Sequence, residues 1–325
     1  MKKKNIVLIG AGQLGSRHLQ ALTKLQAPAH ITVIDPSRDS LDICQTRVRE
    51  IEGWDRHTFV YQQNIESLPG VDFAVVATSA NVRRQVVEKL LETTEVRTLL
   101  LEKVLFQSSK DCIEVGRLLE KKNVRVWVNA PRRMWPCYCA LKSFLEQDRI
   151  LSFVLSGAGW GLACNSYHML DLFAWFAKGR IDHISSELIE DLPISSKRPG
   201  YFELKGTFGG QFSNGSIFVL SDYSGIEKDL EVLIETQNRR IHISEKHGKI
   251  RLISGDALPP EIEALKIIPE FQSNLTNLVA EALLAGESCG LTTYAEASEL
   301  HQKMLDAFAK KFLQIKEGAR VCPIT

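Results

Sequence analysis

Short apolar runs alternate with helical segments over the first 130 residues, and this alternation constrains the fold more than any other feature. The runs are rich in β-branched residues and almost continuously apolar, which is typical of strands that helices cover on both faces. Strand–helix–strand units of this kind form right-handed crossovers and a parallel sheet. We therefore predict an α/β chain that begins with a doubly wound Rossmann sheet. The predicted strands are Asn5–Ile9, Ile31–Ile34, Phe59–Tyr61, Phe73–Ala77, Thr98–Leu101 and Val124–Val128, and the predicted helices are Gln13–Leu25, Val82–Leu91 and Lys110–Lys121.

After about residue 148 the pattern changes to short alternating strands separated by turn residues. Residues 237–239 and 246–248 are polar connections of the kind that close antiparallel hairpins. We expect a second α/β domain built on an open, mainly antiparallel sheet, with domains at residues 1–130 and 131–325. The last helix is a candidate for packing back on the first domain. The predicted elements are strands Ile217–Ser221, Leu230–Thr236, Arg240–Ser244 and Lys249–Ile253, and helices Ser273–Ala285 and Tyr294–Phe312.

The composition favours a folded protein with a small-molecule partner. A length of 325 residues allows two cores, and 44% hydrophobic with 24% charged residues is close to the cytosolic average. Lys and Arg number 40 against 39 Asp and Glu, and the net charge of +1 gives no field to attract nucleic acid or an anionic membrane. The apolar run Ile6–Ile9 is too short for a signal peptide, and no stretch reaches the roughly 20 apolar residues of a membrane span. We expect a cytoplasmic protein.

The 7 cysteines are odd in number and scattered, which argues against a disulfide framework and for reduced thiols. Cys137 and Cys139 form a pair, but no second pair or nearby histidine completes a four-ligand zinc set. We predict no metal site.

A glycine-rich turn lies between the first predicted strand and the first predicted helix. Gly10 permits a tight turn, Gly12 lets the backbone approach a diphosphate at the helix N-terminus, and Gly15 allows close packing of helix on strand. Asp35 ends the next strand, where its carboxylate can accept hydrogen bonds from an adenosine ribose. The pattern predicts a dinucleotide site formed by Gly10, Gly12, Gln13, Leu14, Gly15 and Asp35.

Other interpretations of this turn stay open. The glycines could serve packing alone, or the ligand could be S-adenosylmethionine, whose transferases use a similar turn and acid. Among the dinucleotides, Asp35 would repel a 2′-phosphate and so favours NAD. Ser37 and Arg38 could instead pair with that phosphate and accommodate NADP.

Further motifs follow at the ends of the later strands. They are His18 after the glycine turn, Ala77-Thr78-Ser79, Glu102-Lys103-Val104, Asn129 to Arg133, and Tyr167-His168-Met169-Leu170-Asp171. With these motifs the chain resembles the Gfo/Idh/MocA oxidoreductases, named after glucose–fructose oxidoreductase and inositol dehydrogenase, whose fifth strand ends in Glu-Lys-Pro. The resemblance implies NAD(P)-dependent hydride transfer at a hydroxyl or keto carbon of a sugar, polyol or nucleotide sugar. It also implies a homo-oligomer formed through the second sheet, and cofactor contacts by Thr78, Ser79, Asn81, Glu102 and Lys103.

The family's Glu-Lys-Pro lysine lies beside the nicotinamide and the reacting hydroxyl, which implies this catalytic role for Lys103. A partly desolvated lysine near the positive nicotinamide of NAD⁺ has its charged form disfavoured. Its pKa falls towards neutrality, so it can exchange a proton with an alcohol or ketone oxygen. The alternative is a solvated charge at a strand end.

The second-domain motif of the family commonly reads Asp-x-Gly-x-His-x-x-Asp, and here the corresponding segment runs from Cys164 to Asp171. The match implies that His168 is the proton acceptor or a substrate ligand. A helical histidine that only hydrogen-bonds the core is the alternative. The chain departs from the family at Cys164, where aspartate is usual, and at Val104, where proline is usual. These departures leave open a protein that binds NAD without catalysis, as a sensor or assembly subunit.

Side chains with aromatic faces or guanidinium forks recognise sugars and carboxylates. On this ground, together with the resemblance, the predicted substrate-binding residues are Arg133, Trp160, Asn165, Tyr167 and His168, with Arg132, Tyr138 and Ser166 as further candidates. Structural packing explains five of them about as well, namely Arg132, Arg133, Tyr138, Trp160 and Tyr167.

Overall fold

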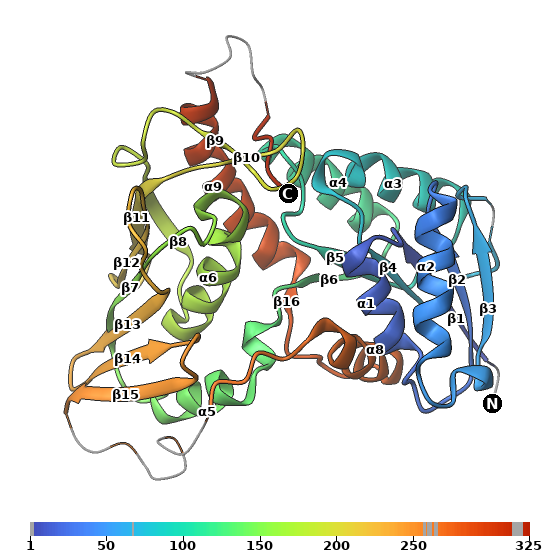
Figure 1. Ribbon diagram of the computed structural model, residues 1–325, viewed down its shortest axis with the longest axis horizontal. Helices are drawn as coiled ribbons and strands as arrows, with labels where there is room; N and C mark the ends of the chain where they lie inside the picture. Colours follow the sequence, from blue (N-terminus) through green and yellow to red (C-terminus); the bar gives the residue numbers. More distant parts are fainter. Residues whose placement is uncertain (1–2, 67, 256–257, 259–261, 263–265, 314–320) are drawn as a thin grey trace. The chain divides into compact units, whose positions relative to one another are not determined.

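The computed structural model describes residues 3–66, 68–255, 258, 262, 266–313 and 321–325. The chain forms two compact units, and Figure 1 labels their helices and strands. The described residues of 1–106, 110–129 and 270–298 form the first unit. Those of 107–109, 130–269 and 299–325 form the second.

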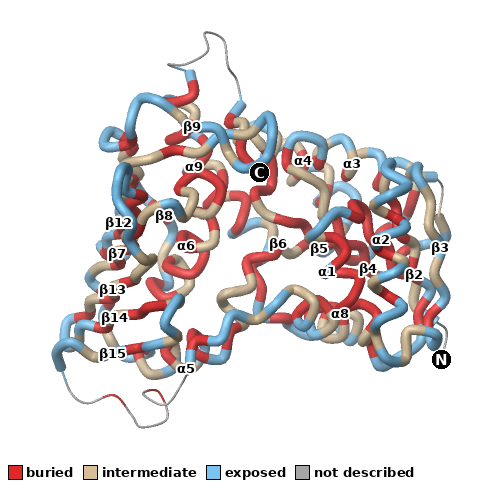
Figure 2. Tube along the Cα trace, viewed as in Figure 1, coloured by how far each residue is buried: buried red, intermediate tan, exposed pale blue. Residues whose placement is uncertain are grey.

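The first unit is built on a parallel sheet with the strand order β3-β2-β1-β4-β5-β6, and a short strand, β16, adds antiparallel to β6. Strands β4 and β5 are buried along their whole length, as their continuous apolar sequence predicts (Figure 2). The predicted Rossmann architecture is confirmed. The strands are β1 Lys4–Ile9, β2 Ala29–Ile34, β3 Thr58–Gln62, β4 Phe73–Val76, β5 Thr98–Glu102, β6 Arg125–Asn129 and β16 Thr292–Thr293.

Helix α2, Arg38–Arg49, is not predicted by the sequence pattern. It begins at Ser37, whose Oγ accepts a hydrogen bond from the Ser40 N–H at 3.2 Å. Its buried side chains are Leu41, Cys44 and Val48, an apolar stripe too narrow to stand out from a polar segment. The other helices that begin in or belong to this unit are α1 Gln13–Leu22, η1 Trp54–Arg56, α3 Ala80–Thr93, α4 Ser109–Lys121, η3 Gln272–Asn274 and α8 Thr276–Ala285.

The second unit is built on a sheet with the order β15-β14-β13-β7-β12-β11-β8. Its neighbours are antiparallel except β7 and β12, which run parallel, so the predicted mainly antiparallel sheet is confirmed. Both predicted hairpins are present. The strands are β7 Ile150–Ala158, β8 Ile181–Ser185, β11 Gly206–Phe212, β12 Ile217–Tyr223, β13 Glu231–Thr236, β14 Arg240–Ser244 and β15 Lys249–Ser254, with a separate ribbon of β9 Ile194–Ser195 and β10 Phe202–Glu203.

One face of this sheet is covered by α6, Leu162–Ala177, and by α9, Tyr294–Leu313 (Figure 1). Phe153 of β7 stacks on Phe173 of α6 with ring centroids 4.6 Å apart, and Phe208 of β11 meets Phe308 of α9 at 5.0 Å. Aromatic side chains therefore hold α6 in a fixed place on the sheet. Two short helices, η2 Pro131–Met134 and α5 Pro136–Phe144, precede the sheet in sequence.

Residues 270–298 follow the second sheet in sequence but belong to the first unit. Lys24 of that unit donates to the Ser273 carbonyl at 2.8 Å, and the Gln26 N–H donates to Glu281 at 3.0 Å. The sequence indicates the last helix as the candidate for this return. In the structure α8 and the first turn of α9 make this return, whereas α9 from residue 299 onward belongs to the second unit.

Candidate cofactor and active site

The glycine turn after β1 is packed tightly against the end of β4. Gly10 has φ +95°, and a Cβ there would lie 2.9 Å from the backbone of Ala77 and Thr78. A Cβ on Gly15 would lie 1.8 Å from the Gly10 carbonyl oxygen. Gly10 and Gly15 are thus required by the packing of α1 on the sheet.

Gly12 has a different surrounding. It caps α1 without a side-chain hydrogen bond, and a Cβ on it would meet nothing within 4 Å. The first turn of α1 holds no acidic residue. This arrangement fits a diphosphate at the helix N-terminus.

Asp35 joins the end of β2 to the glycine turn. Its Oδ2 accepts from the Ala11 N–H at 2.6 Å, and its Oδ1 accepts from the Ser37 N–H at 2.8 Å. An ionised carboxylate can accept about four hydrogen bonds. Asp35 therefore has capacity left for the hydroxyls of an adenosine ribose.

The side chains beside Asp35 have partners of their own. Ser37 caps α2, and the exposed Arg38 pairs with Asp42 at 3.2 Å. Gln13, in the glycine turn, accepts from Arg47 of α2 at 3.1 Å, and Leu14 is half-buried.

The turn after β4 carries Thr78, Ser79 and Asn81. Ser79 donates to the Asn81 side chain at 2.7 Å. The Thr78 hydroxyl is buried and has no hydrogen-bond partner among the residues that the structure describes. An unsatisfied hydroxyl at the carboxyl edge of a Rossmann sheet fits a polar cofactor group at this edge.

Glu102, at the end of β5, belongs to a buried polar network. Its Oε1 lies 2.9 Å from Nε2 of His18 and accepts from the Asn129 amide, and its Oε2 accepts from the Lys103 N–H at 3.2 Å. His18 Nδ1 contacts the Thr276 hydroxyl at 2.8 Å. Burial raises the pKa of Glu102, but the hydrogen bond and charge of His18, the Asn129 amide and the Arg83 charge outweigh it and lower the pKa. Glu102 is therefore a buried anion whose partners fix the end of β5.

Lys103 follows Glu102 and is half-buried; its peptide bond to Val104 is cis. The carbonyls of Val104 and Leu105 accept hydrogen bonds from Arg83 of α3, which also donates to the Thr78 carbonyl. Because parallel strands end at one edge of a sheet, the first unit gathers the glycine turn, Asp35, Thr78 and Lys103 at a single edge.

In the second unit, two carboxylates fix the start of α6. Asp222 of β12 has no exposed surface and accepts from the N–H groups of Gly159 at 2.6 Å and Gly161 at 3.0 Å. Lys205 pairs with the same carboxylate at 2.6 Å. Glu203 of β10 accepts from the N–H groups of Ala163 at 2.9 Å and Cys164 at 3.3 Å. Both acids satisfy helix N–H groups that would otherwise be unpaired.

The residues predicted to bind substrate lie on and beside α6. His168 is half-buried, one helical turn after Cys164. Trp160 donates to the Ser221 carbonyl at 2.8 Å, and Asn165 donates to the Trp160 carbonyl at 2.6 Å. Tyr167 has no exposed surface and stacks on His301 with centroids 3.7 Å apart. Packing within the unit thus accounts for Tyr167, in place of the substrate contact that we expected.

The arginines after β6 are held by acids. Arg133 donates to the Asp171 carboxylate at 2.7 Å. Arg132 forms a bidentate ion pair with Glu245, with both hydrogen bonds at 2.9 Å, and Tyr138 donates to the same carboxylate at 2.6 Å. Burial raises the pKa of Glu245, but the charge of Arg132 and the hydrogen bonds from Arg132 and Tyr138 outweigh burial and lower this pKa. These side chains therefore pair with one another within the second unit.

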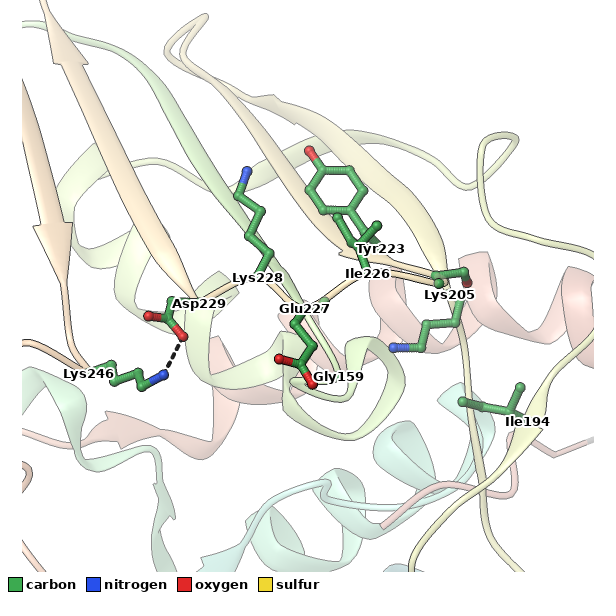
Figure 3. Close-up of a pocket in the computed structure, with 12 residues that line it drawn as sticks. Gly159, Ile194, Lys205, Tyr223, Ile226, Glu227, Lys228, Asp229 and Lys246 are labelled. Atoms are coloured by element: carbon green, nitrogen blue, oxygen red, sulfur yellow. Dashed lines mark hydrogen bonds and ion pairs between the residues drawn. The ribbon is translucent and has the colours of Figure 1, made fainter.

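A cavity of about 550 Å³ opens in the second unit beside the loop that leads to α6 (Figure 3). Gly159, Tyr223 and Glu227 line it together with Lys205, Lys228 and Lys246. Lys246 pairs with Asp229 at 2.6 Å, and Lys228 lies 5.1 Å from the centre of the Tyr223 ring. Its lining mixes apolar and polar side chains and carries charges of both signs.

Residues 4–130 match the model of the Gfo/Idh/MocA family, described as an oxidoreductase family with an NAD-binding Rossmann fold. The resemblance inferred from the motifs is confirmed for this part of the chain. Among curated proteins, none matches the chain at a significant level.

Solved structures similar to the whole chain share its fold. An oxidoreductase from Agrobacterium radiobacter in complex with NAD⁺, L-tartaric acid and magnesium has a TM-score of 0.74 and 16% identity, over 96% of this chain and 97% of that chain. Scyllo-inositol dehydrogenase from Lactobacillus casei with NAD(H) and scyllo-inositol has a TM-score of 0.66 and 17% identity, over 95% and 98%. A super-repressor mutant of Gal80p from Saccharomyces cerevisiae has a TM-score of 0.73 and 14% identity, over 96% of each chain.

The residues of the first unit fit an NAD cofactor. Gly12 leaves space at the start of α1, Asp35 retains acceptor capacity, and the Thr78 hydroxyl lacks a partner within the described residues. No group of three or more His, Cys, Asp or Glu side chains in the described part of the chain could hold a metal ion, and none of the seven cysteines, all within the described ranges, forms a disulfide. Of the helices in the described ranges, none is both long and apolar enough to span a membrane.

Sequence analysis missed Arg83, Asp222 and Glu203. Arg83 lies in an amphipathic helix beside Arg84, and nothing in its spacing distinguishes the buried arginine from the exposed one. Asp222 and Glu203 act on a helix about 40 to 60 positions earlier in the chain. No local pattern signals contacts over such separations.

Proposed function

We propose that the protein is an NAD-dependent oxidoreductase that transfers hydride at a hydroxyl or keto carbon of a sugar, polyol or nucleotide sugar. The observation that carries the proposal is the placement of Lys103, whose neighbouring backbone is bound by Glu102 and Arg83 at the sheet edge that holds the glycine turn. The match of residues 4–130 to an oxidoreductase family supports hydride chemistry.

The first unit supplies the binding groups and one proton-transfer group. The nicotinamide, when bound, supplies the hydride donor or acceptor. The N–H groups at the start of α1 bind the diphosphate, and Asp35 binds the adenosine ribose. Lys103 takes the hydroxyl proton during oxidation and returns a proton to the carbonyl oxygen during reduction. Glu102 acts on the backbone of Lys103, since its carboxylate is occupied by His18 and Asn129.

The second unit supplies His168 as the other group at the reacting hydroxyl. Asp222 and Glu203 hold the first turn of α6 and thereby set the helix that carries His168. Trp160 and Asn165, in the same loop and turn, remain candidates for the substrate pocket. Arg133 is a weaker candidate because its guanidinium is bound to Asp171.

NAD is the proposed cofactor in preference to NADP. Asp35 would face a 2′-phosphate with a negative charge, and the two groups that could offset it are occupied. Ser37 caps α2, and Arg38 pairs with Asp42.

A second candidate function is NAD binding without catalysis. Cys164 stands where the family has a carboxylate, and the fold is shared with a super-repressor form of Gal80p. Turnover of any sugar or polyol would exclude this function.

We also propose a homo-oligomer formed through the outer face of the second sheet. Val219, Val154 and Leu233 form an apolar row in register across β12, β7 and β13. Light scattering of Val154→Glu should show a smaller species than the unaltered protein. An unaltered protein that is already monomeric would contradict the oligomer.

The test of function has two stages. Mass spectrometry of the purified protein should detect carried-over NAD, and a panel of polyols, sugars and nucleotide sugars should include a compound that changes nicotinamide absorbance. Binding of S-adenosylmethionine without NAD would contradict the proposal, as would absence of turnover across the panel.

A further inference from the structure

Arg83 is a charged side chain in the interior of the first unit. Only 1% of the residue is exposed, although an arginine is rarely buried so completely. It projects from the first turns of α3 towards the ends of β4 and β5. Its neighbour Arg84 is a surface residue paired with Glu88, Asp111 and Glu114.

The Arg83 guanidinium binds backbone carbonyls of two separate turns. One nitrogen, Nη1, donates to the carbonyls of Val104 and Leu105, the latter at 2.9 Å. The other, Nη2, donates to the carbonyl of Thr78. The planar guanidinium places its donors on separate nitrogens in fixed directions and so reaches both turns, whereas the three donors of a lysine ammonium share one nitrogen.

These contacts hold the backbone of Lys103 from both sides. Its own N–H donates to Glu102 at 3.2 Å, and the carbonyls of the next two residues accept from Arg83. Glu102 is 3% exposed and Arg83 is 1% exposed, so both restraints act in the interior, where hydrogen bonds to charges are strong. The half-buried side chain of Lys103 thus extends from a backbone held by buried ions.

We propose that Arg83 is a positioning residue for Lys103, and that it fixes this lysine relative to the turn at Thr78. The inference rests on the proposed function, in which Lys103 transfers the proton and the Thr78 turn contacts the cofactor. Arg83 acts through the carbonyls of Val104, Leu105 and Thr78. Its loss therefore displaces the Lys103 amine by a fraction of the reacting distance, which costs rate more than binding.

The experiment compares Arg83→Lys and Arg83→Ala with the matched variants Arg84→Lys and Arg84→Ala on the same helix. We expect Arg83→Lys to lower kcat on the order of 10- to 100-fold, with a smaller change in substrate KM. Millimolar guanidinium should restore part of the kcat of Arg83→Ala, because the free ion fits the space left by the side chain. The Arg84 variants should keep their kcat and show no response to guanidinium.

Folding is monitored by thermal unfolding, and Arg83→Lys carries the test if Arg83→Ala does not fold. An unchanged kcat in folded Arg83→Lys would overturn the proposal. The proposal would also be overturned if the kcat of Arg83→Ala falls only in proportion to the loss of folded protein and guanidinium does not restore it.

A measurement independent of turnover separates this inference from the proposed function. The rate at which acetic anhydride modifies Lys103, followed by mass spectrometry, should change in both Arg83 variants and stay constant in the Arg84 variants. Full activity of Lys103→Met would refute the catalytic role of the lysine. If the labelling of Lys103 is nevertheless altered in the Arg83 variants, the positioning role of Arg83 stands. Unaltered labelling in the Arg83 variants would refute the positioning.

Discussion

The Asp35 carboxylate accepts a hydrogen bond from the Ala11 N–H at 2.6 Å, so the residue that we assign to the ribose also holds the glycine turn. Two substitutions separate these roles. Asp35→Ala removes the charged acceptor of the Ala11 N–H and of the adenosine ribose. We expect NAD affinity to fall on the order of 10- to 100-fold, which corresponds to a loss of about 1.5–3 kcal/mol of binding free energy. Asp35→Asn keeps an oxygen for Ala11 and should bind NAD more tightly than Asp35→Ala.

Calorimetric titration of NAD and NADP into the three proteins checks this prediction. NADP affinity should stay constant or rise in both variants, because a negative charge facing the 2′-phosphate is removed. The ribose assignment fails if Asp35→Ala binds NAD as tightly as the unaltered protein.

The pairing of Arg132 with Glu245 predicts a stability effect in the second unit. Both side chains are mostly buried, and removing one partner leaves an uncompensated charge. We expect Arg132→Met to lower the free energy of unfolding by about 3 kcal/mol. Tyr138→Phe removes one hydrogen bond to the charged Glu245, which costs about 1.5–3 kcal/mol.

Arg240→Met is the matched control, because Arg240 forms a similar pair with Glu235 at 2.6 Å on the surface of the same sheet. Its loss should cost no more than about 1 kcal/mol in urea unfolding. Equal losses for Arg132→Met and Arg240→Met would show that burial does not strengthen the first pair.

His57 makes the first unit less stable in mild acid. Its Nδ1 accepts from the Ala29 N–H at 3.2 Å, and its Nε2 lies 3.1 Å from the Thr23 carbonyl, an arrangement that requires the neutral ring. Burial lowers the pKa of His57 below its ordinary value of 6.5. The unfolded chain therefore binds a proton at a higher pH than the folded chain does. The contribution of neutral His57 to the free energy of unfolding is complete above about pH 6.5. It is lost as the pH falls below this value, by at most about 1.4 kcal/mol per pH unit.

Thermal unfolding between pH 7.5 and 5.5, values spanning about one unit on each side of the ordinary histidine pKa, tests this effect. His57→Gln cannot titrate, so its unfolding temperature should fall less over this range than that of the unaltered protein. Identical pH dependences would show that His57 is not the responsible group.

The predictable parts of the site are those that depend on nearby residues. Gly10, Gly15 and Asp35 lie within one strand–helix–strand unit, where spacing alone indicates a turn and a strand end. The same spacing could not show that Asp35 bonds Ala11, because that contact depends on the register of β1 and β2. The parallel sheet itself followed from alternating apolar runs, whereas the polar helix α2 escaped this signal.

The residues that hold the site in place come from distant parts of the chain. His18 and Glu102 are 84 positions apart, and His18 and Thr276 are 258 positions apart. Tyr167 shows the opposite limitation: its ring is a reasonable sugar contact by residue type, but the fold stacks it on His301. Long-range packing, which no local pattern records, decides whether such a side chain reaches a pocket.

The proposed chemistry predicts large losses of turnover in Lys103→Met and His168→Asn. A positioned acid or base contributes roughly 10²- to 10⁴-fold to rate, so each substitution should lower kcat within this range. Met keeps most of the Lys103 stem and Asn keeps a polar group at position 168, so folding and NAD affinity should change little. Nicotinamide absorbance with a substrate from the panel measures kcat, and calorimetry measures NAD binding.

Cys164 provides the internal contrast for this prediction. It lies one helical turn before His168, and its N–H donates to Glu203 at 3.3 Å. A neutral thiol cannot replace the charge of the family's aspartate, and Cys164→Ser leaves the backbone contact with Glu203 in place. We expect a decrease in kcat of less than about tenfold, well below that of a positioned acid or base. Full activity in both the Lys103 and His168 variants would refute the mechanism, whereas an inactive Cys164→Ser protein would indicate chemistry at the thiol.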